Sequence, residues 1–346
     1  MPQTKKRKVK RITLRGSAIF GIKSFRRLSE IMRAPEDLLR HLADSDNNYI
    51  EFDLKGRWIE NPKPALKRIH QRFSFLLSQI ETPDYLHSGV KGRSYITNSS
   101  KHVANLRSVK VDVKKFYPSS RSAEVYRFLT EDLEWSKDVS GLFTRIMTIK
   151  GHLPTGGNAS PILSFWAYKP LFDEVHDLAS AAGCHFSLYI DDMTLSGELA
   201  TRTLMRDVRS AVGRYRLNAH KFKVFSKGQT RVVTGVAQTR FGPKLPIRRQ
   251  ELIRHNRLAL RNAKTETERL PLLRTLVGRL CEAVEIDPVG WNDHAKLAIK
   301  ESKMIDRRSL RRGIITLPTA PIEVADSGTD AAPPWSEPIL ISTITA

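Results

Sequence analysis

Three aspartates have the type and spacing that could carry chemistry. Asp191 and Asp192 stand side by side between two apolar stretches of strand period in Tyr189-Ile190-Asp191-Asp192-Met193-Thr194-Leu195-Ser196, which predicts a hairpin with both acids at its tip. Asp112 lies in a second predicted strand, Val109-Lys110-Val111-Asp112-Val113. An acidic pair at a turn is by itself usually just solvated, but a sheet that joins this strand to the hairpin would gather three like charges, which need cations to coexist. Oxygen ligands suit Mg²⁺, and two such ions about 3.5–4 Å apart are typical of phosphoryl transfer.

The charge of the chain indicates a polyanionic partner. Its 346 residues include 58 Lys and Arg against 36 Asp and Glu, a formal net charge of +22. Such an excess is typical of proteins that bind nucleic acid, and an enzyme of small acidic substrates fits it less well. There is no apolar run of membrane-spanning length, no signal-peptide pattern and no basic amphipathic helix with large apolar anchors. We therefore expect a cytoplasmic protein without a membrane partner. Cys184 and Cys281 are too far apart for the paired spacing of a zinc site.

The elements that must position the aspartates are predicted from periodicity and breakers. A hairpin is expected over 49–59 with its turn at Lys55-Gly56, a strand over 185–190, and helices over 65–80, 201–215 and most of 248–312. Residues 1–24 are expected to be a basic arm, because the first fifteen hold seven bases and no acid. Residues 313–346, with four acids, no base and many Pro, Ser and Thr, are expected to be a disordered tail. Between them we expect two domains, 25–240 and 241–312.

Four sequence blocks resemble the palm motifs of the reverse transcriptase family in type, order and spacing. They are Asp112-Val113-Lys114-Lys115-Phe116-Tyr117-Pro118, Leu153-Pro154-Thr155-Gly156-Gly157-Asn158-Ala159-Ser160-Pro161, Tyr189-Ile190-Asp191-Asp192 and Asn218-Ala219-His220-Lys221. The resemblance runs from about residue 25 to about residue 312. Within the family it is closest to bacterial retron enzymes, because Asn98-Ser99-Ser100-Lys101-His102 is similar to their Asn-Ala-x-x-His signature and Val233-Thr234-Gly235 matches their Val-Thr-Gly signature.

This resemblance implies an α/β right-hand polymerase, with fingers and palm over 25–240, built from an antiparallel sheet and helices, and a helical thumb over 241–312. The implied activity is RNA-templated DNA synthesis from dNTPs with two Mg²⁺ ions. For a retron enzyme it further implies a structured non-coding RNA as template, with an internal 2′-hydroxyl as one route of priming, an RNA–DNA product (msDNA), and a role in defence against phage. A separate effector protein is a further partner that the resemblance allows.

Three other functions stay open at this point. A related defence reverse transcriptase could prime on a protein side chain, and a degenerate polymerase fold could only scaffold RNA. An RNA-dependent RNA polymerase is disfavoured by Tyr117, because the family keeps an aromatic ring at this position against the sugar, where it would clash with a 2′-hydroxyl.

The resemblance also assigns roles to individual residues in the catalytic centre. Asp112, Asp191 and Asp192 would ligate both metal ions, with Asp192 alternatively an orienting acid beside the other two. Lys221 would protonate the departing pyrophosphate as general acid, or simply bind phosphate, and Lys223 is near enough in sequence to compete for that role. Tyr117 could instead be a core residue.

The remaining expected contacts are to the incoming nucleotide and to the template and primer. Arg57, and Lys55 beside it, resemble fingertip bases that hold the triphosphate, although exposed bases on a hairpin are often only solvated. Gly156 would let the backbone approach the nucleotide, whereas Thr155 departs from the Gln of many relatives. Thumb bases would follow the nucleic-acid backbone: Arg248, Arg249, Arg254, Arg257, Arg261, Arg274 and Arg279.

Overall fold

A computed structural model of the chain describes residues 11–311, and side chains up to residue 305. These residues form two compact units. The first comprises Leu106–Lys227 together with the chain up to Ser94, and the second comprises Tyr95–Asn105 together with the chain from Gly228. The expected acidic tail, 313–346, and the first ten residues of the expected basic arm lie outside the described residues. Each unit has its own hydrophobic core.

The first unit begins with a segment that packs inward. Ile12 bridges to Ile80, and Ile19 and Ile22 are buried in the core. The described part of segment 1–24 therefore packs against this unit and does not extend from it. The elements that follow are α1 (Phe25–Met32), α2 (Glu36–Asp44), the antiparallel hairpin β1 (Tyr49–Leu54) and β2 (Arg57–Pro62), and α3 (Pro64–Ser78). The hairpin predicted at this position is confirmed.

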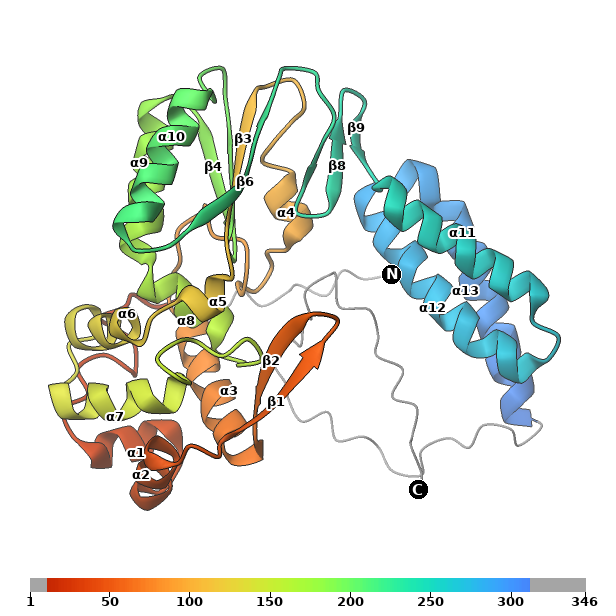
Figure 1. Cartoon of the computed structure of the whole chain (residues 1–346). Coiled ribbons are helices and arrows are strands. Elements are labelled where there is room, and N and C mark those ends of the chain that lie inside the picture. The colour runs from red at the N-terminus through yellow and green to blue at the C-terminus, as the bar shows by residue number, and fades with distance from the viewer. Residues whose placement is uncertain (1–10, 312–346) are drawn as a thin grey trace. The chain divides into compact units, whose positions relative to one another are not determined.

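A four-stranded antiparallel sheet in the order β4-β5-β3-β6 organises the rest of the first unit (Figure 1). Its strands are β3 (Ser108–Val113), β4 (His185–Tyr189), β5 (Asp192–Ser196) and β6 (Ala219–Phe225). Strand alternation sends Val109, Val111 and Val113 into the core and leaves Lys110 and Asp112 on the opposite face. The sheet thus separates an apolar face, which makes the core, from a polar face.

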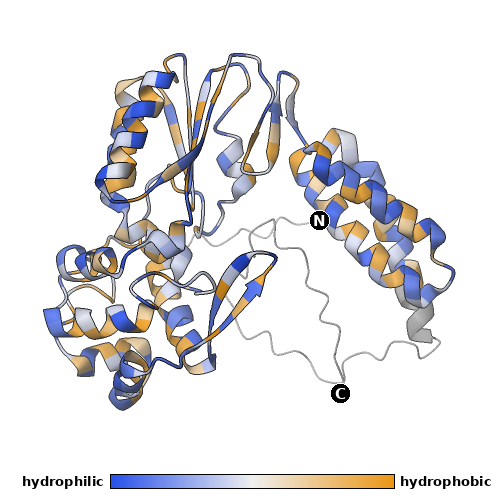
Figure 2. Ribbon diagram, in the orientation of Figure 1, coloured by the Kyte–Doolittle hydropathy of each residue, from blue (hydrophilic) through white to orange (hydrophobic). Residues whose placement is uncertain are grey.

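Helices connect and cover these strands. The helices α9 (Lys169–Ala181) and α10 (Arg202–Arg214) pack against the sheet, and the buried side chains of α10 repeat at helical spacing as predicted: Leu204, Val208, Ala211 and Val212. Figure 2 shows this mixture of hydrophobic and hydrophilic residues along both helices. The other connections are α5 (Phe116–Ser119), α6 (Ser122–Arg127), a single π-helical turn (Phe128–Asp132), α7 (Lys137–Met147) and α8 (Ser160–Ala167).

The second unit combines a short sheet with three long helices. Its elements are α4 (Tyr95–Ser99), the antiparallel strands β7 (Arg231–Val233), β8 (Val236–Thr239) and β9 (Gly242–Lys244), and the helices α11 (Ile247–Asn262), α12 (Glu266–Ile286) and α13 (Pro288–Arg311). The helix α12 starts at a capping box in which Thr265 and Glu268 each bond the other's backbone N–H. The helical character predicted for 248–312 is confirmed, but this unit also takes in residues 95–105 and 228–240, which sequence periodicity did not connect to it.

Candidate active site

The three aspartates lie together at one end of the four-stranded sheet. Asp112 on β3 is the cross-strand partner of Asp192, the first residue of β5. Asp191 occupies the turn between β4 and β5, directly after Ile190, whose φ is 60°. A left-handed backbone is costly for a β-branched residue, and such outliers gather at functional sites. The predicted hairpin with acids at its tip is confirmed.

The proximity of these carboxylates perturbs their protonation. Burial, followed by the charges of Asp112 and Asp192, raises the pKa of Asp191 well above its usual range. Burial also raises the pKa of Asp192, although the nearby ammonium of Lys110 opposes this rise. Like charges held together in a low dielectric disfavour ionisation. The site therefore concentrates negative charge that a cation would stabilise.

Two lysines supply positive charge to the site. Lys110 Nζ lies 2.6 Å from Asp192 Oδ2, and Lys221 Nζ lies 3.1 Å from Asp112 Oδ2. Lys221 was expected here, but Lys110 was missed. The signal was available, because Lys110 and Asp112 are two residues apart on one strand and must share a face.

A β-bulge in β6 explains how Lys221 reaches the aspartates. Lys110 pairs with Lys223 and Asp112 pairs with His220, so β6 carries one extra residue between these two pairs. Lys221 lies in this bulge and has a φ of 53°. Bulges bend a strand and change the aim of a side chain. As a result His220 Nε2, 3.5 Å away, and Lys221 Nζ both approach the same Asp112 oxygen, whereas Lys223 stays with Lys110.

The oxygen donors are suitable for a hard cation. The Oδ1 atom of Asp192 is buried without a hydrogen-bond partner, and an orphaned carboxylate oxygen beside two other carboxylates is suited to Mg²⁺. Across residues 11–311, however, no group of three or more His, Cys, Asp or Glu side chains is arranged to hold a metal ion. The ammonium groups of Lys110 and Lys221 already neutralise part of the charge.

Tyr117 lies close to the aspartates. It is half-buried in α5, its ring centroid 5.8 Å from that of Phe116. Burial raises the pKa of its phenol, and the charge of Asp191 raises it further. Phe116 is fully packed against Tyr168 and Phe172. Of the two neighbouring rings, Phe116 is the core residue and Tyr117 is the one beside the carboxylates.

The expected nucleotide-binding residues lie on the hairpin and on the loop between α7 and α8. Lys55 and Gly56 form the β1–β2 turn, both with positive φ, and Arg57 begins β2 with an exposed side chain. Gly156 lies against β2, where a Cβ atom would be only 2.7 Å from the carbonyl oxygen of Glu60. Glycine is thus required at this position by a contact within the protein.

Several retron reverse transcriptases are similar to this chain in sequence. The chain is 28% identical over 176 residues to the retron Se72 reverse transcriptase of Salmonella heidelberg, covering 49% of this chain and 46% of that protein. It is 28% identical over 232 residues to the retron Mx65 reverse transcriptase of Myxococcus xanthus (58% and 52%), and 26% identical over 263 residues to the retron Mx162 enzyme of the same organism (64% and 54%). The chain is similar to bacterial retron reverse transcriptases. It spans about half the length of these relatives, and no protein-family model matches it.

The two segments that resemble retron signatures contact each other in the second unit. Asn98 Nδ2 donates to Thr234 Oγ1 at 3.2 Å, and Thr234 Oγ1 donates to the carbonyl of Tyr95 at 2.8 Å. Gln238 Nε2 donates to Ser99 Oγ at 2.8 Å. All of these side chains except that of Tyr95, which is half-buried, are buried. The two retron-like signatures therefore form one buried polar network, which their separation in sequence concealed.

The same network continues into the long helices. Gly235 has a φ of +90°, and a Cβ atom there would lie 2.7 Å from Arg249 Nη2. Arg249 Nη1 donates to Glu282 at 2.7 Å, Tyr95 donates to the same carboxylate oxygen at 2.6 Å, and the guanidinium lies 5.3 Å from the Tyr95 ring centroid. Gly235 thus leaves room for an arginine that links α11 to α12.

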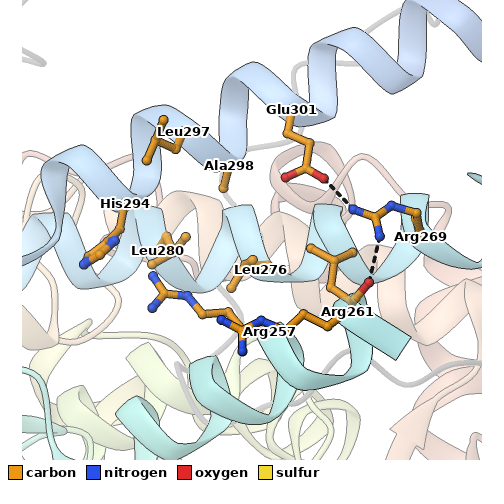
Figure 3. Close-up of a pocket in the computed structure, with 10 residues that line it drawn as sticks. Arg257, Arg261, Arg269, Leu276, Leu280, His294, Leu297, Ala298 and Glu301 are labelled. Carbon is orange, nitrogen blue, oxygen red and sulfur yellow. Dashed lines mark hydrogen bonds and ion pairs between the residues drawn. The ribbon is translucent and has the colours of Figure 1, made fainter. Parts of the chain in front are cut away.

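Four of the seven bases expected to follow nucleic acid have different surroundings in the second unit. Arg249 pairs with Glu282, and Arg279 bonds Asn256 and the carbonyl of Leu252, so both are used inside the second unit. Arg257 and Arg261 instead line a pocket of about 330 Å³ between α11, α12 and α13 (Figure 3). Two further charged residues of the lining, Arg269 and Glu301, form an ion pair with a distance of 2.7 Å between Nη2 and Oε1. The apolar residues of the lining are Leu260, Leu276, Leu280, Leu297 and Ala298.

Among residues 11–311, no helix combines the length and the apolar character needed to cross a bilayer.

Proposed function

We propose that this chain is an RNA-directed DNA polymerase of retron type that copies a structured non-coding RNA into DNA. The observation that carries the proposal is the pairing of Asp112 with Asp192 across β3 and β5, with Asp191 in the adjoining turn. Similarity to three retron reverse transcriptases supports it. The fingers (β1–β2 and the neighbouring helices), the palm (the four-stranded sheet) and the thumb (α11–α13) are part of the proposal.

The three aspartates would hold two Mg²⁺ ions. When bound, these ions would lower the pKa of the primer's terminal hydroxyl and neutralise charge on the triphosphate. Lys110 would have to release Asp192 for an ion to bind there, because its ammonium lies 2.6 Å from Asp192 Oδ2. Lys221, on the β6 bulge and 68% exposed, would donate a proton to the leaving pyrophosphate.

The incoming dNTP would be held by residues around this site. Tyr117 would place its ring against the sugar and exclude a 2′-hydroxyl. Arg57, an exposed guanidinium, would bind the triphosphate with Lys55, since a planar fork of donors suits phosphate oxygens. Gly156 would place loop backbone beside the base pair.

The partner would be a structured RNA bound by the basic surface, and the product an RNA–DNA molecule. The exposed thumb bases Arg248, Arg254 and Arg261 would make such contacts, and Arg257 lines a pocket together with Arg261. The proposal extends to a cytoplasmic location, a role in defence against phage and an accompanying effector protein, as expected for a retron.

Primer extension tests the proposed chemistry. The purified chain should extend a DNA or RNA primer on an RNA template with dNTPs and MgCl₂, and Asp191→Asn should abolish extension. The matched control is Asp293→Asn, which removes a carboxylate that is 93% exposed on α13 and should leave extension intact. Extension that survives Asp191→Asn would refute the assignment, and a wild type that binds RNA without extending any primer would identify an RNA scaffold.

Sequencing the nucleic acid that copurifies with the chain tests the retron assignment separately. Branched RNA–DNA is the expected product. DNA attached to a tyrosine or serine side chain would instead identify a protein-primed defence reverse transcriptase, with the polymerase chemistry unchanged.

A further inference from the structure

The loop between α7 and α8 is bonded to the second strand of the β1–β2 hairpin through Thr155. The Thr155 hydroxyl donates to the carbonyl of Trp58 at 2.8 Å and accepts from the Glu60 N–H at 3.1 Å. The Thr155 N–H donates to Glu60 Oε2 at 3.1 Å, and the Gly156 N–H donates to the Glu60 carbonyl at 3.2 Å. The hydroxyl of Thr155, as donor and as acceptor, and its backbone N–H therefore all form hydrogen bonds with β2.

Glu60 is the centre of these contacts. It is only 3% exposed, and its second carboxylate oxygen, Oε1, lies 2.9 Å from His152 Nε2. A buried carboxylate is costly unless each oxygen is hydrogen-bonded. Because both of its oxygens bond to the loop, Glu60 clamps the loop at two points, His152 and Thr155.

The same part of the loop is also bonded to the segment that follows Asp112. The Leu153 N–H donates to the carbonyl of Ser120, the residue after α5, at 3.0 Å. The Ser160 hydroxyl at the start of α8 donates to the carbonyl of Pro154 at 2.7 Å. Short hydrogen bonds therefore connect the strand that begins with Arg57 to the helix that carries Tyr117.

From these contacts we infer that Thr155 is a positioning residue that, with Glu60 and His152, sets the place of the hairpin bases Lys55 and Arg57 relative to the aspartates. The inference rests on the proposed polymerase function and deepens it. It also gives Thr155 a role different from a direct contact with the nucleotide. The hydroxyl has no hydrogen left to donate to a ligand, because its single hydrogen bonds Trp58.

Steady-state kinetics of Thr155→Val tests this role. Valine keeps the shape of threonine but has no hydroxyl, so the side-chain bonds to the Trp58 carbonyl and from the Glu60 N–H are lost. The backbone bonds from Thr155 and Gly156 to Glu60 remain, so the connection between hairpin and loop is weakened. We expect the KM for dNTP to rise roughly tenfold, equivalent to about 1.4 kcal/mol, with kcat and the affinity for template and primer unchanged. Thr155→Ser, which keeps the hydroxyl, should restore the wild-type KM.

Two further variants separate positioning from folding. Glu60→Gln keeps size but weakens the clamp, and should raise the same KM. Thr130→Val is the matched control, because the Thr130 hydroxyl bonds only to carbonyls one turn earlier, those of Tyr126 and Arg127, and it should leave KM unchanged. Active-site titration corrects every kcat for the fraction of folded enzyme.

The outcomes distinguish this inference from the proposed function. If the wild type extends primers and Thr155→Val has a lower active fraction but an unchanged KM, Thr155 is merely structural and the inference is overturned alone. An unrestored KM in Thr155→Ser overturns it as well. If the wild type extends no primer under any condition, the proposed function fails, and the inference with it.

Discussion

Replacing Asp191 with Asn should abolish primer extension and, in the absence of metal, make the folded protein more stable. Asp191 is half-buried beside Asp112 and Asp192. Its partial burial, followed by the charges of these two aspartates, raises its pKa from 3.8 to about 8. The fold therefore disfavours the ionised form of Asp191, which keeps a proton at neutral pH unless a bound cation takes its place. Asparagine has nearly the same shape and cannot ionise, so the variant folds without the cost of this proton uptake.

The size and the sign of the effect follow from linkage. At pH 7 the native Asp191 holds a proton that the unfolded chain, with a pKa of about 3.9, has released. The native state thus binds more protons, and its stability falls as pH rises from about 4 to about 8. About three pH units separate the unfolded pKa from pH 7, and each is worth about 1.4 kcal/mol. The increase in the free energy of unfolding caused by Asp191→Asn at pH 7 is therefore at most about 4 kcal/mol. We expect a measured gain of about 1–4 kcal/mol.

Urea unfolding in EDTA measures this gain. The free energy of unfolding should be higher for Asp191→Asn than for the wild type at pH 7.5, and the difference should shrink at pH 5.5, by at most about 3 kcal/mol. Asp293→Asn should stay within about 0.5 kcal/mol of the wild type at both values. Added MgCl₂ should stabilise the wild type and not the variant. A variant less stable than the wild type at pH 7.5, or a difference independent of pH, would refute the clustering of the three charges.

Three other substitutions test separate parts of the structure. Tyr117→Val should reduce the preference for dNTPs over rNTPs, measured as the ratio of kcat/KM values, by roughly 10- to 200-fold; an unchanged ratio would contradict the role of the ring. Burial lowers the pKa of His70 to about 4, so the wild type should lose about 1.4 kcal/mol of stability per pH unit relative to His70→Gln as pH falls from about 6.5 to about 4; urea unfolding that shows parallel pH profiles would contradict this. Gly235→Ala should destabilise by about 1–3 kcal/mol in thermal unfolding, because of its positive φ and the contact with Arg249. Its control, Gly278→Ala on α12, meets no atom within 4 Å and should be neutral or stabilising by up to about 1 kcal/mol; equal effects of the two would contradict the steric argument.

Some of this protein could be predicted from local sequence patterns. Alternation is a property of the backbone itself, so Val109-Lys110-Val111-Asp112-Val113 had to place Asp112 and Lys110 on one face of a strand. The hairpin with Asp191 and Asp192 at its tip, the hairpin over 49–59 and the helix α10 followed from the same kind of pattern, and all are present. The face on which a residue lies within one strand or helix depends only on the backbone geometry of that strand or helix.

Contacts between distant segments could not be predicted in this way. The sequence did not reveal that Asp112 pairs with Asp192, that β6 bulges at Lys221, or that Thr155 bonds Glu60. Nor did it separate Arg249, used internally, from Arg257, which lines a pocket. Strand register, bulges and the direction of a long side chain depend on how whole elements pack. Burial and hydrogen bonding between distant segments determine all three.

The sequence by itself thus determined which residues could do the chemistry and on which strands they lie. The tertiary structure alone decided that Lys110 joins the three carboxylates and Lys221, and that residues 95–105 join the segment from Gly228 onward. The physical reason is the range of the interactions involved. Backbone geometry repeats over two to four residues, whereas the electrostatics of a site sums charges that only folding brings together.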